Sequence, residues 1–312
     1  MRFAAAAFAV LTLVACSKSQ STGSTGTGAA SSSSGTGGTG GQPPITIGSR
    51  SAEVYVPTGY KQGTPAPLVV MLHGYSIPGG LEELYLELKP LADEHGFLYV
   101  YPDGTMDQKG NPFWNATDAC CNYFGSTVDD SAYLSSLIDT ISQKYSVDPK
   151  RVFIIGHSNG GFMAYRMACE HADKIAAIVS LAGAMYDDPS TCKPSSPVSV
   201  LQAHGTSDNE VLFAGFAGDT TPGNGPYPSA NVTAQDWATL DGCATTPDTS
   251  SPPLDLDDTL PGAETTVSKW EQGCKSGSAV ELWTIQGGSH IPSIGTTFRE
   301  GIISFLLAHP KP

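Results

Sequence analysis

Residues 152–161 read VFIIGHSNGG, four large apolar or aromatic residues followed by a serine that stands between glycines. Such an unbroken apolar run suits a strand that is covered on both faces, as in a parallel sheet. The pentapeptide 156–160 has the form G-x-S-x-G, and the residues after it have helical periodicity. A serine on this strand-to-helix turn is held out at the edge of a sheet. The stretch therefore predicts an α/β fold in which Ser158 is a nucleophile.

Apolar runs and helical segments alternate on both sides of this stretch. Strands are predicted at 51–56, 68–73, 97–101, 152–156, 176–182, 198–204 and 280–285. Helical periodicity is found at 81–94, 130–145, 160–171 and 297–308. This order is typical of βαβ layers, so we expect one α/β domain over residues 45–312, with a mostly parallel central sheet and helices on both of its faces.

A serine hydroxyl needs an imidazole to take its proton and a carboxylate to orient that imidazole. His290 follows the strand predicted at 280–285 through a Gly-Gly-Ser loop, which is able to bring the ring over the sheet edge. Asp208 lies on a tight turn after the strand predicted at 198–204, where open α/β sheets place catalytic groups. The chain order of serine, aspartate and histidine predicts Ser158, Asp208 and His290 as a catalytic triad.

Other residues of these types are less suited. His171 and His309 are expected at the surface, and His204 is expected to pack beneath the acid. Asp129 or Asp130 is expected to cap the following helix. The remaining aspartates fall in loops that are expected to face solvent: Asp187, Asp188, Asp255, Asp257 and Asp258.

The transition state of acyl transfer places negative charge on the carbonyl oxygen, which two backbone N–H groups must stabilise. One donor is expected at Asn159, directly after the nucleophile, and the other at Tyr75, in the glycine-rich turn after the strand 68–73. The Tyr75 ring is expected either to line the pocket or to pack on its own loop. Trp114 and Trp237 are candidates for stacking against an aromatic acyl group or a sugar.

The amino-terminal residues indicate export. Arg2 precedes an apolar run at 3–14, which has the length of a signal-peptide core. The run ends before Cys16 in a pattern that resembles a bacterial lipobox, which implies lipidation of that thiol and, with Ser17 after it, the outer membrane or cell surface. Residues 17–44 are almost all Ser, Thr, Gly and Ala, so we expect a disordered tether. An ordinary secretory signal is the alternative.

Six cysteines remain beside Cys16, and an even number in an exported chain favours disulfides. The preferred pairs are Cys243–Cys274, Cys169–Cys192 and Cys120–Cys121, although crossed pairing is equally open. The adjacent pair does not match the C-x-x-C spacing of structural zinc. A calcium site at the acidic stretch 255–258 is a further alternative, and the role of the insertion 244–263 is open.

The chain carries 16 basic and 30 acidic side chains, a formal charge of −14. Such a charge repels the phosphate backbone and anionic lipid surfaces, so nucleic acid is not an expected partner, and contact with a membrane is expected only through the lipid anchor. We expect a monomer.

Seven short motifs together resemble the polyhydroxybutyrate depolymerase-like and feruloyl esterase family of secreted α/β-hydrolase esterases. They are Leu72-His73-Gly74, Tyr101-Pro102-Asp103-Gly104, Trp114-Asn115-Ala116, Val128-Asp129-Asp130, Gly156-His157-Ser158-Asn159-Gly160-Gly161, His204-Gly205-Thr206-Ser207-Asp208 and Gly287-Gly288-Ser289-His290. The resemblance spans about residues 51–312. It implies an α/β-hydrolase fold and an ester substrate, such as a hydroxycinnamate on plant polysaccharide or a polyester, with no metal and no cofactor. Many relatives have Trp two residues after the histidine, whereas this chain has Ile291-Pro292, which alters the pocket wall.

These observations predict a carboxylic ester hydrolase that works through an acyl-enzyme. A serine exopeptidase on the same scaffold is one alternative, although we see no propeller or large cap of the kind that gates peptides. A non-catalytic polysaccharide-binding lipoprotein is the other, and a binding protein has no need of a serine, aspartate and histidine in this order.

Overall fold

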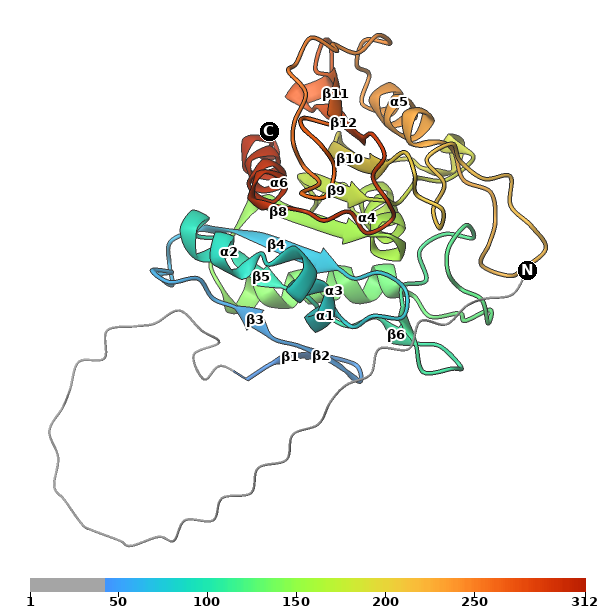
Figure 1. The fold of residues 1–312 in the computed structure, drawn as a ribbon. Coiled ribbons are helices and arrows are strands. Elements are labelled where there is room, and N and C mark those ends of the chain that lie inside the picture. The colour runs from blue at the N-terminus through green and yellow to red at the C-terminus, as the bar shows by residue number, and fades with distance from the viewer. Residues whose placement is uncertain (1–42) are drawn as a thin grey trace, which may run out of the picture. The chain divides into compact units, whose positions relative to one another are not determined.

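An eight-stranded sheet forms the centre of the computed structural model, which describes residues 43–312 (Figure 1). Its strand order is β11-β12-β10-β9-β8-β4-β5-β3. The strands are β3 (Val54–Tyr55), β4 (Ala66–Leu72), β5 (Leu98–Val100), β8 (Val147–His157), β9 (Ala177–Leu181), β10 (Ser199–Gly205), β11 (Thr265–Trp270) and β12 (Val280–Ile285). All neighbours run parallel except the edge pairs β3 with β5 and β11 with β12. The expectation of a mostly parallel α/β sheet is confirmed.

Helices cover both faces of this sheet (Figure 1). Along β4, Leu68, Val70 and Leu72 point into one core, while Val69 and Met71 point into the other. This alternation explains why the whole strand is apolar, because both faces of a central parallel strand are buried. The first core contains residues of α3 (Asp130–Lys144), α4 (Asn159–Glu170) and α5 (Ala230–Leu240). The second contains residues of α1 (Gly79–Leu86), α2 (Lys89–His95) and α6 (Thr296–Ala308).

One helix predicted from periodicity, 81–94, is two helices in the structure. The backbone of Glu87 is left-handed, with φ of 49°, and ends α1. Pro90 then stands in the first turn of α2, where its missing N–H is no loss. The predicted helix failed because proline in a helix interior would remove a hydrogen bond and clash with the preceding turn.

The first predicted strand is also divided. Residues 51–56 form parts of β2 (Arg50–Ala52), which pairs with β1 (Ile45–Ile47), and of β3. A third small sheet joins β6 (Thr105–Met106) to β7 (Pro112–Phe113). Two short 3₁₀ helices, at Pro189–Thr191 and Lys275–Gly277, complete the regular elements of the part described here.

The insertion 244–263 lies along the edge of the sheet. Its backbone bridges β11 at Asp248 with Lys269 and at Leu254 with Thr265, and Asp257 bridges Ile294 in the segment before α6. Asp257 is buried and accepts hydrogen bonds from Thr259, contrary to the expectation that it faces solvent. The insertion therefore covers an edge strand, which would otherwise expose unpaired backbone groups.

The cysteines form the three preferred pairs: Cys120–Cys121, Cys169–Cys192 and Cys243–Cys274. The second pair ties the end of α4 to the segment before β10. The third ties the segment after α5 to the segment after β11. These two disulfides fasten connecting segments in the part of the chain that follows Ser158.

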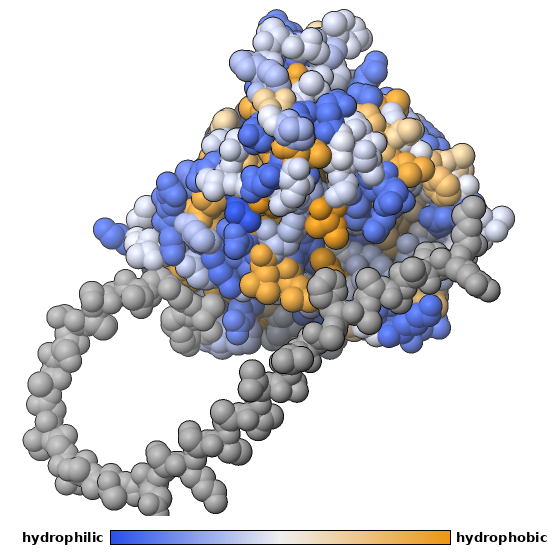
Figure 2. Space-filling view, viewed as in Figure 1, coloured by the Kyte–Doolittle hydropathy of each residue, from blue (hydrophilic) through white to orange (hydrophobic). Residues whose placement is uncertain are grey.

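Apolar residues occur as small patches among hydrophilic ones on the face drawn in Figure 2. The exposed large hydrophobic side chains of the described region are Leu81, Leu84, Met106, Leu212, Val232 and Ile291. None of the helices within residues 43–312 has the length and apolar character needed to span a bilayer. The expected signal, Cys16 and most of the expected tether lie outside the described residues.

Candidate active site

Ser158 stands on the sharp turn between β8 and α4. Its φ of 54° and ψ of −120° lie in a region that non-glycine residues rarely adopt. The two flanking glycines make the turn possible: a Cβ on Gly156 would overlap the backbone of Gly160, and a Cβ on Gly160 would overlap the carbonyl of Leu72. The sequence pattern thus produces a serine held out at the carboxyl edge of the sheet.

The imidazole of His290 bridges Ser158 and Asp208. Its Nε2 lies 2.9 Å from Ser158 Oγ, and its Nδ1 lies 2.8 Å from Asp208 Oδ2. Asp208 follows β10 and His290 follows β12, and these strands are parallel neighbours, so their carboxyl ends meet at one edge. All three residues are at least nine-tenths buried. The structure brings together the three side chains that the sequence predicts.

Asp208 is held as a carboxylate by a ring of donors. Its Oδ1 accepts hydrogen bonds from the backbone N–H groups of Glu210 and Val211, both at 2.9 Å. Burial alone would raise the pKa of Asp208, but the contacts with His204 and His290 outweigh burial and hold the pKa well below its usual range. The carboxylate is therefore charged at neutral pH and able to stabilise a protonated His290.

His204 packs against the acid, as expected, and its contacts define a supporting role. Its Nε2 lies 2.8 Å from the carbonyl oxygen of Val211 and 3.3 Å from Asp208 Oδ2. It therefore fixes the turn that carries Asp208. The sequence predicts that His204 packs beneath the acid, but it gives no signal for the contact with the carbonyl oxygen of Val211.

Two backbone N–H groups are available for an oxyanion. Within residues 43–312, neither Tyr75 N–H nor Asn159 N–H donates to a protein acceptor. The side chain of Asn159 is occupied instead, because it exchanges two hydrogen bonds of 2.7 and 2.9 Å with the backbone of Trp114. Trp114 Nε1 in turn donates to the carbonyl of His73, which ties α4 to the loop that carries Tyr75.

A pocket of about 290 Å³ opens beside Ser158 and His290. Four aromatic residues line it: Tyr75, Tyr123, Phe162 and Tyr227. The Tyr75 and Tyr123 rings meet edge to face at 5.1 Å, and the Phe162 and Tyr227 rings meet similarly at 5.6 Å. Tyr75 lines the pocket, and its hydroxyl donates to Asp107, in the turn between β6 and β7, at 2.6 Å. Periodicity gave no signal for Tyr123 or Tyr227, which lie in loops far from the triad in sequence.

The remaining pocket lining includes the Cys120–Cys121 disulfide and Ile291. Ile291 is 57% exposed and stands at the position directly after the catalytic-histidine candidate. The side chain there is aliphatic and partly open to solvent, consistent with an altered wall.

Trp114 and Trp237 do not line the pocket, contrary to the sequence-based expectation. Both side chains are fully buried. Trp114 packs against the ring of His73, and Trp237 donates its Nε1 to the carbonyl of Val198 at 2.7 Å. Their indole N–H groups are satisfied inside the protein, as buried tryptophans require, so they are core residues.

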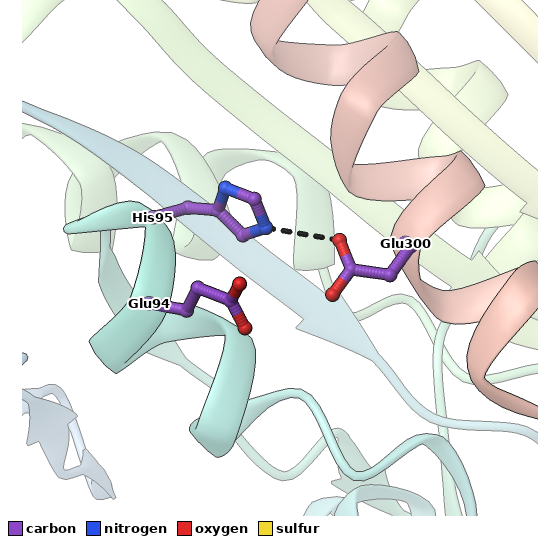
Figure 3. A group of neighbouring side chains, drawn as sticks. All are labelled: Glu94, His95 and Glu300. Atoms are coloured by element: carbon purple, nitrogen blue, oxygen red, sulfur yellow. Dashed lines mark hydrogen bonds and ion pairs between the residues drawn. The ribbon is translucent and has the colours of Figure 1, made fainter.

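One group of potential metal ligands occurs within the described residues, and it lies away from the triad. Figure 3 shows His95 of α2 facing Glu300 of α6, with Glu94 beside them. His95 Nε2 lies 3.0 Å from Glu300 Oε2. His95 precedes the amino end of β5, whereas the triad lies at the carboxyl ends of the strands, so the group takes no part in this site. The acidic stretch 255–258 does not form such a group.

The parallel sheet, the turn at Ser158 and the chain order of the three side chains define an α/β-hydrolase. Residues 46–252 match the model of the Esterase family, described as "Putative esterase". The chain belongs to this family of esterases, which confirms the resemblance found in the sequence motifs.

Curated relatives include both feruloyl esterases and a polyester depolymerase. Feruloyl esterase B of Piromyces equi is 28% identical over 250 residues, which is 79% of this chain and 43% of that protein. Feruloyl esterase D of Neurospora crassa is 28% identical, over 78% of this chain and 75% of that protein. Poly(3-hydroxyalkanoate) depolymerase C of Paucimonas lemoignei is 28% identical, over 76% and 57%. The chain thus spans less than half of the Piromyces protein.

The fold is shared with solved esterase structures. The acetyl xylan esterase from Aspergillus awamori has a TM-score of 0.56 and 17% sequence identity, over 82% of this chain and 93% of that chain. A thermostable esterase has the same TM-score at 16% identity, over 84% and 60%. These likenesses concern the fold.

Proposed function

We propose that residues 45–312 form a serine carboxylesterase in which Ser158 is the nucleophile, His290 the general base and Asp208 the residue that orients the base. One observation carries this proposal: the His290 ring lies within hydrogen-bond reach of both Ser158 Oγ and Asp208 Oδ2. Membership of an esterase family supports it.

The proposed reaction has two halves. In acylation, His290 Nε2 takes the proton of Ser158 Oγ while the oxygen attacks the ester carbonyl carbon. The N–H groups of Tyr75 and Asn159 stabilise the negative carbonyl oxygen, and protonated His290 gives its proton to the departing alcohol. In deacylation, His290 takes a proton from a water molecule whose oxygen attacks the acyl carbon. The bond between that carbon and Ser158 Oγ then breaks, His290 returns the proton to Ser158 Oγ, and the acid leaves. The scheme uses the side chains and backbone of this chain and calls for no metal or cofactor.

The pocket favours an aromatic acyl group. Four aromatic side chains line its walls, and aromatic rings pack well edge to face or offset against such walls. A hydroxycinnamoyl ester is therefore the proposed substrate, ahead of a polyester, and two relatives are named as esterases of one such group, the feruloyl group. Plant polysaccharide is the proposed carrier of that group. A hydrolysis panel of methyl ferulate, acetylated xylan, short nitrophenyl esters and polyhydroxybutyrate tests this choice. Preference for polyhydroxybutyrate, by kcat/KM, would reverse it.

Replacement of the nucleophile tests the reaction. Ser158→Ala should lower kcat on a nitrophenyl ester by roughly a million-fold, the scale seen when a serine nucleophile is removed. Ser136→Ala, an exposed serine on α3, is the control and should leave kcat unchanged. Substantial activity in Ser158→Ala would refute the assignment. Aminoacyl anilides in the same assay test the exopeptidase alternative, and turnover of these in preference to esters would favour it.

We further propose that the enzyme is exported and anchored by lipid at Cys16, with residues 17–44 as a tether. The support is the apolar run 3–14 followed by the lipobox-like Cys16, together with three disulfides, which suit an oxidising compartment. In a bacterial host, full-length protein should incorporate a labelled fatty acid and sediment with membranes, and Cys16→Ser should do neither. Labelling of Cys16→Ser at the wild-type level would contradict the anchor.

A further inference from the structure

A buried ion pair lies beside the triad and has no part in the proposed reaction. Glu82 of α1 is fully buried, and His157, the last residue of β8, is 3% exposed. Glu82 Oε1 lies 3.0 Å from His157 Nδ1. Burial of two ionisable groups is costly unless they are paired and hydrogen-bonded, and such pairs in a cleft are candidates for a functional role.

Both nitrogens of the His157 ring face acceptors. Nδ1 faces the Glu82 carboxylate, and Nε2 lies 3.1 Å from the backbone carbonyl oxygen of His290. A neutral imidazole has one N–H, whereas an imidazolium has two, so the charged ring satisfies both contacts. The ring of His290 itself lies 5.2 Å from that of His157, between centroids.

The electrostatics of the pair agree with this geometry. Burial lowers the pKa of His157, but the Glu82 carboxylate, the His290 carbonyl and the charge of Asp208 outweigh burial, so the pKa is raised. Burial raises the pKa of Glu82, but His157 and the Gly74 N–H outweigh it, so that pKa is lowered. Tyr85, also on α1, packs beside the pair, with its ring 5.5 Å from that of His157, between centroids.

The second carboxylate oxygen of Glu82 contacts the loop after β4, which carries Tyr75. Oε2 accepts a hydrogen bond of 3.0 Å from the backbone N–H of Gly74, the residue directly before Tyr75. A Cβ on Gly74 would lie 3.4 Å from Ser158 Cβ, so this loop passes close to the nucleophile. The pair therefore connects three segments that are far apart in the chain: the loop after β4, the end of β8 and the loop that carries His290.

We propose that Glu82 and His157 are positioning residues that act as one buried brace: His157 fixes the backbone of His290, and Glu82 fixes the loop that presents Tyr75 N–H. This inference rests on the proposed ester hydrolysis. Neither side chain contributes to the proton transfers, so the brace sets the spacing between the base and the oxyanion donor. A misplacement of about 1 Å in such a geometry costs on the order of a hundred-fold in rate.

Two neutral variants test the brace. Glu82→Gln keeps an oxygen for Gly74 but removes the charge that holds the second proton on His157, and His157→Gln removes the ring that spans both partners. Each should lower kcat at least ten-fold on a short nitrophenyl ester, with KM changed less than three-fold, because neither substitution replaces one of the four aromatic side chains that line the pocket.

Glu83, the next residue in the chain, provides a matched control. Glu83 lies on the same helix and is also buried, but its carboxylate accepts from Tyr99 Oη at 2.6 Å and from Lys89 N at 3.1 Å. Glu83→Gln should lower the melting temperature without a loss of kcat. A purely structural role for Glu82 would make the two variants alike in both measurements.

The double variant closes the test. Because the two residues act as one unit, Glu82→Gln/His157→Gln should be no slower than the slower single variant. A wild-type kcat in folded Glu82→Gln or His157→Gln, or a double loss equal to the product of the single losses, would overturn the brace. If one single variant does not fold, the kcat of the other decides.

Fluorophosphonate labelling of wild-type Ser158 separates failure of the brace from failure of the proposed function. Absence of labelling would refute the proposed esterase mechanism, whereas a labelled wild type with equally active variants would refute the brace alone.

Discussion

Asp208 has more hydrogen-bond donors than the orientation of one imidazole requires. Besides His290, it is contacted by His204 and by the backbone N–H groups of Glu210 and Val211. These donors keep the carboxylate charged and fix its direction, so a neutral His290 is expected to carry its proton on Nδ1, toward Asp208, with Nε2 facing Ser158. In the proposed reaction, the turn after β10 thus sets the tautomer of the base.

Removal of this charge should disable the base while leaving the fold intact. Asp208→Asn presents an amide to His290 Nδ1, which favours the wrong tautomer, and kcat should fall roughly ten-thousand-fold. Steady-state kinetics on a nitrophenyl ester measure the loss. Asp219→Asn, an exposed aspartate of the following loop, is the control. A loss below ten-fold would show that the carboxylate does not orient the base.

Asp241 illustrates the opposite electrostatic case. It ends α5, is buried, and its pKa is raised to about 7 by that burial. The folded state therefore binds a proton that the unfolded state releases between about pH 4 and pH 7. Stability from this group is fully present below the unfolded pKa and is lost as the pH rises through 7.

Asp241→Asn should remove this pH dependence. At pH 8 the variant should be more stable than the wild type, by on the order of 2–4 kcal/mol, with little difference near pH 4. Urea unfolding from pH 4 to pH 8 measures the change, with Asp173→Asn, an exposed aspartate, as the control. Parallel stability curves for wild type and Asp241→Asn would contradict this prediction.

Among the elements, the start of α3 gives different roles to two adjacent aspartates that the sequence does not distinguish. Asp129 is the N-cap and accepts from Ala132 N at 3.1 Å. Asp130 is fully buried and accepts from Arg50 at 2.6 Å and from the backbone N–H of Asn115 at 2.7 Å. It therefore joins α3 to the segment that follows β7 and to the small sheet of β1 and β2.

The two aspartates should respond differently to the same change. Asp130→Asn breaks a largely buried ion pair and should lower the free energy of unfolding by about 3 kcal/mol. Asp129→Asn should change it by less than about 0.5 kcal/mol, because Asn and Asp are equally good N-caps. Chemical denaturation of both variants at pH 7 makes the comparison. Equal losses would mean that the two residues share the capping role.

At the scale of the whole molecule, sequence reasoning succeeds where chemistry and chain order act together. Ser158, Asp208 and His290 follow β8, β10 and β12, and parallel strands bring their carboxyl ends to one edge. Glu82 gives no such signal, because its partners lie 75 and 8 positions away along the chain and only the packing of α1 on the sheet joins them. The helices predicted from the sequence do not include α5.

The prediction that Trp114 and Trp237 contact a ligand was wrong for a different reason. Their size suits either a ligand or a core, and burial in three dimensions decides between the two roles. Trp114 contributes to the site indirectly, since its backbone holds the Asn159 side chain.

The most direct measurement of the central claim is covalent labelling of the wild type and of His290→Ala with a fluorophosphonate, followed by peptide mass spectrometry. The phosphonyl group should appear on the peptide that contains Ser158, at one equivalent, and labelling of His290→Ala should be slower by several orders of magnitude. Labelling at another residue, or equal rates in both proteins, would contradict a nucleophile at Ser158 that is activated by His290.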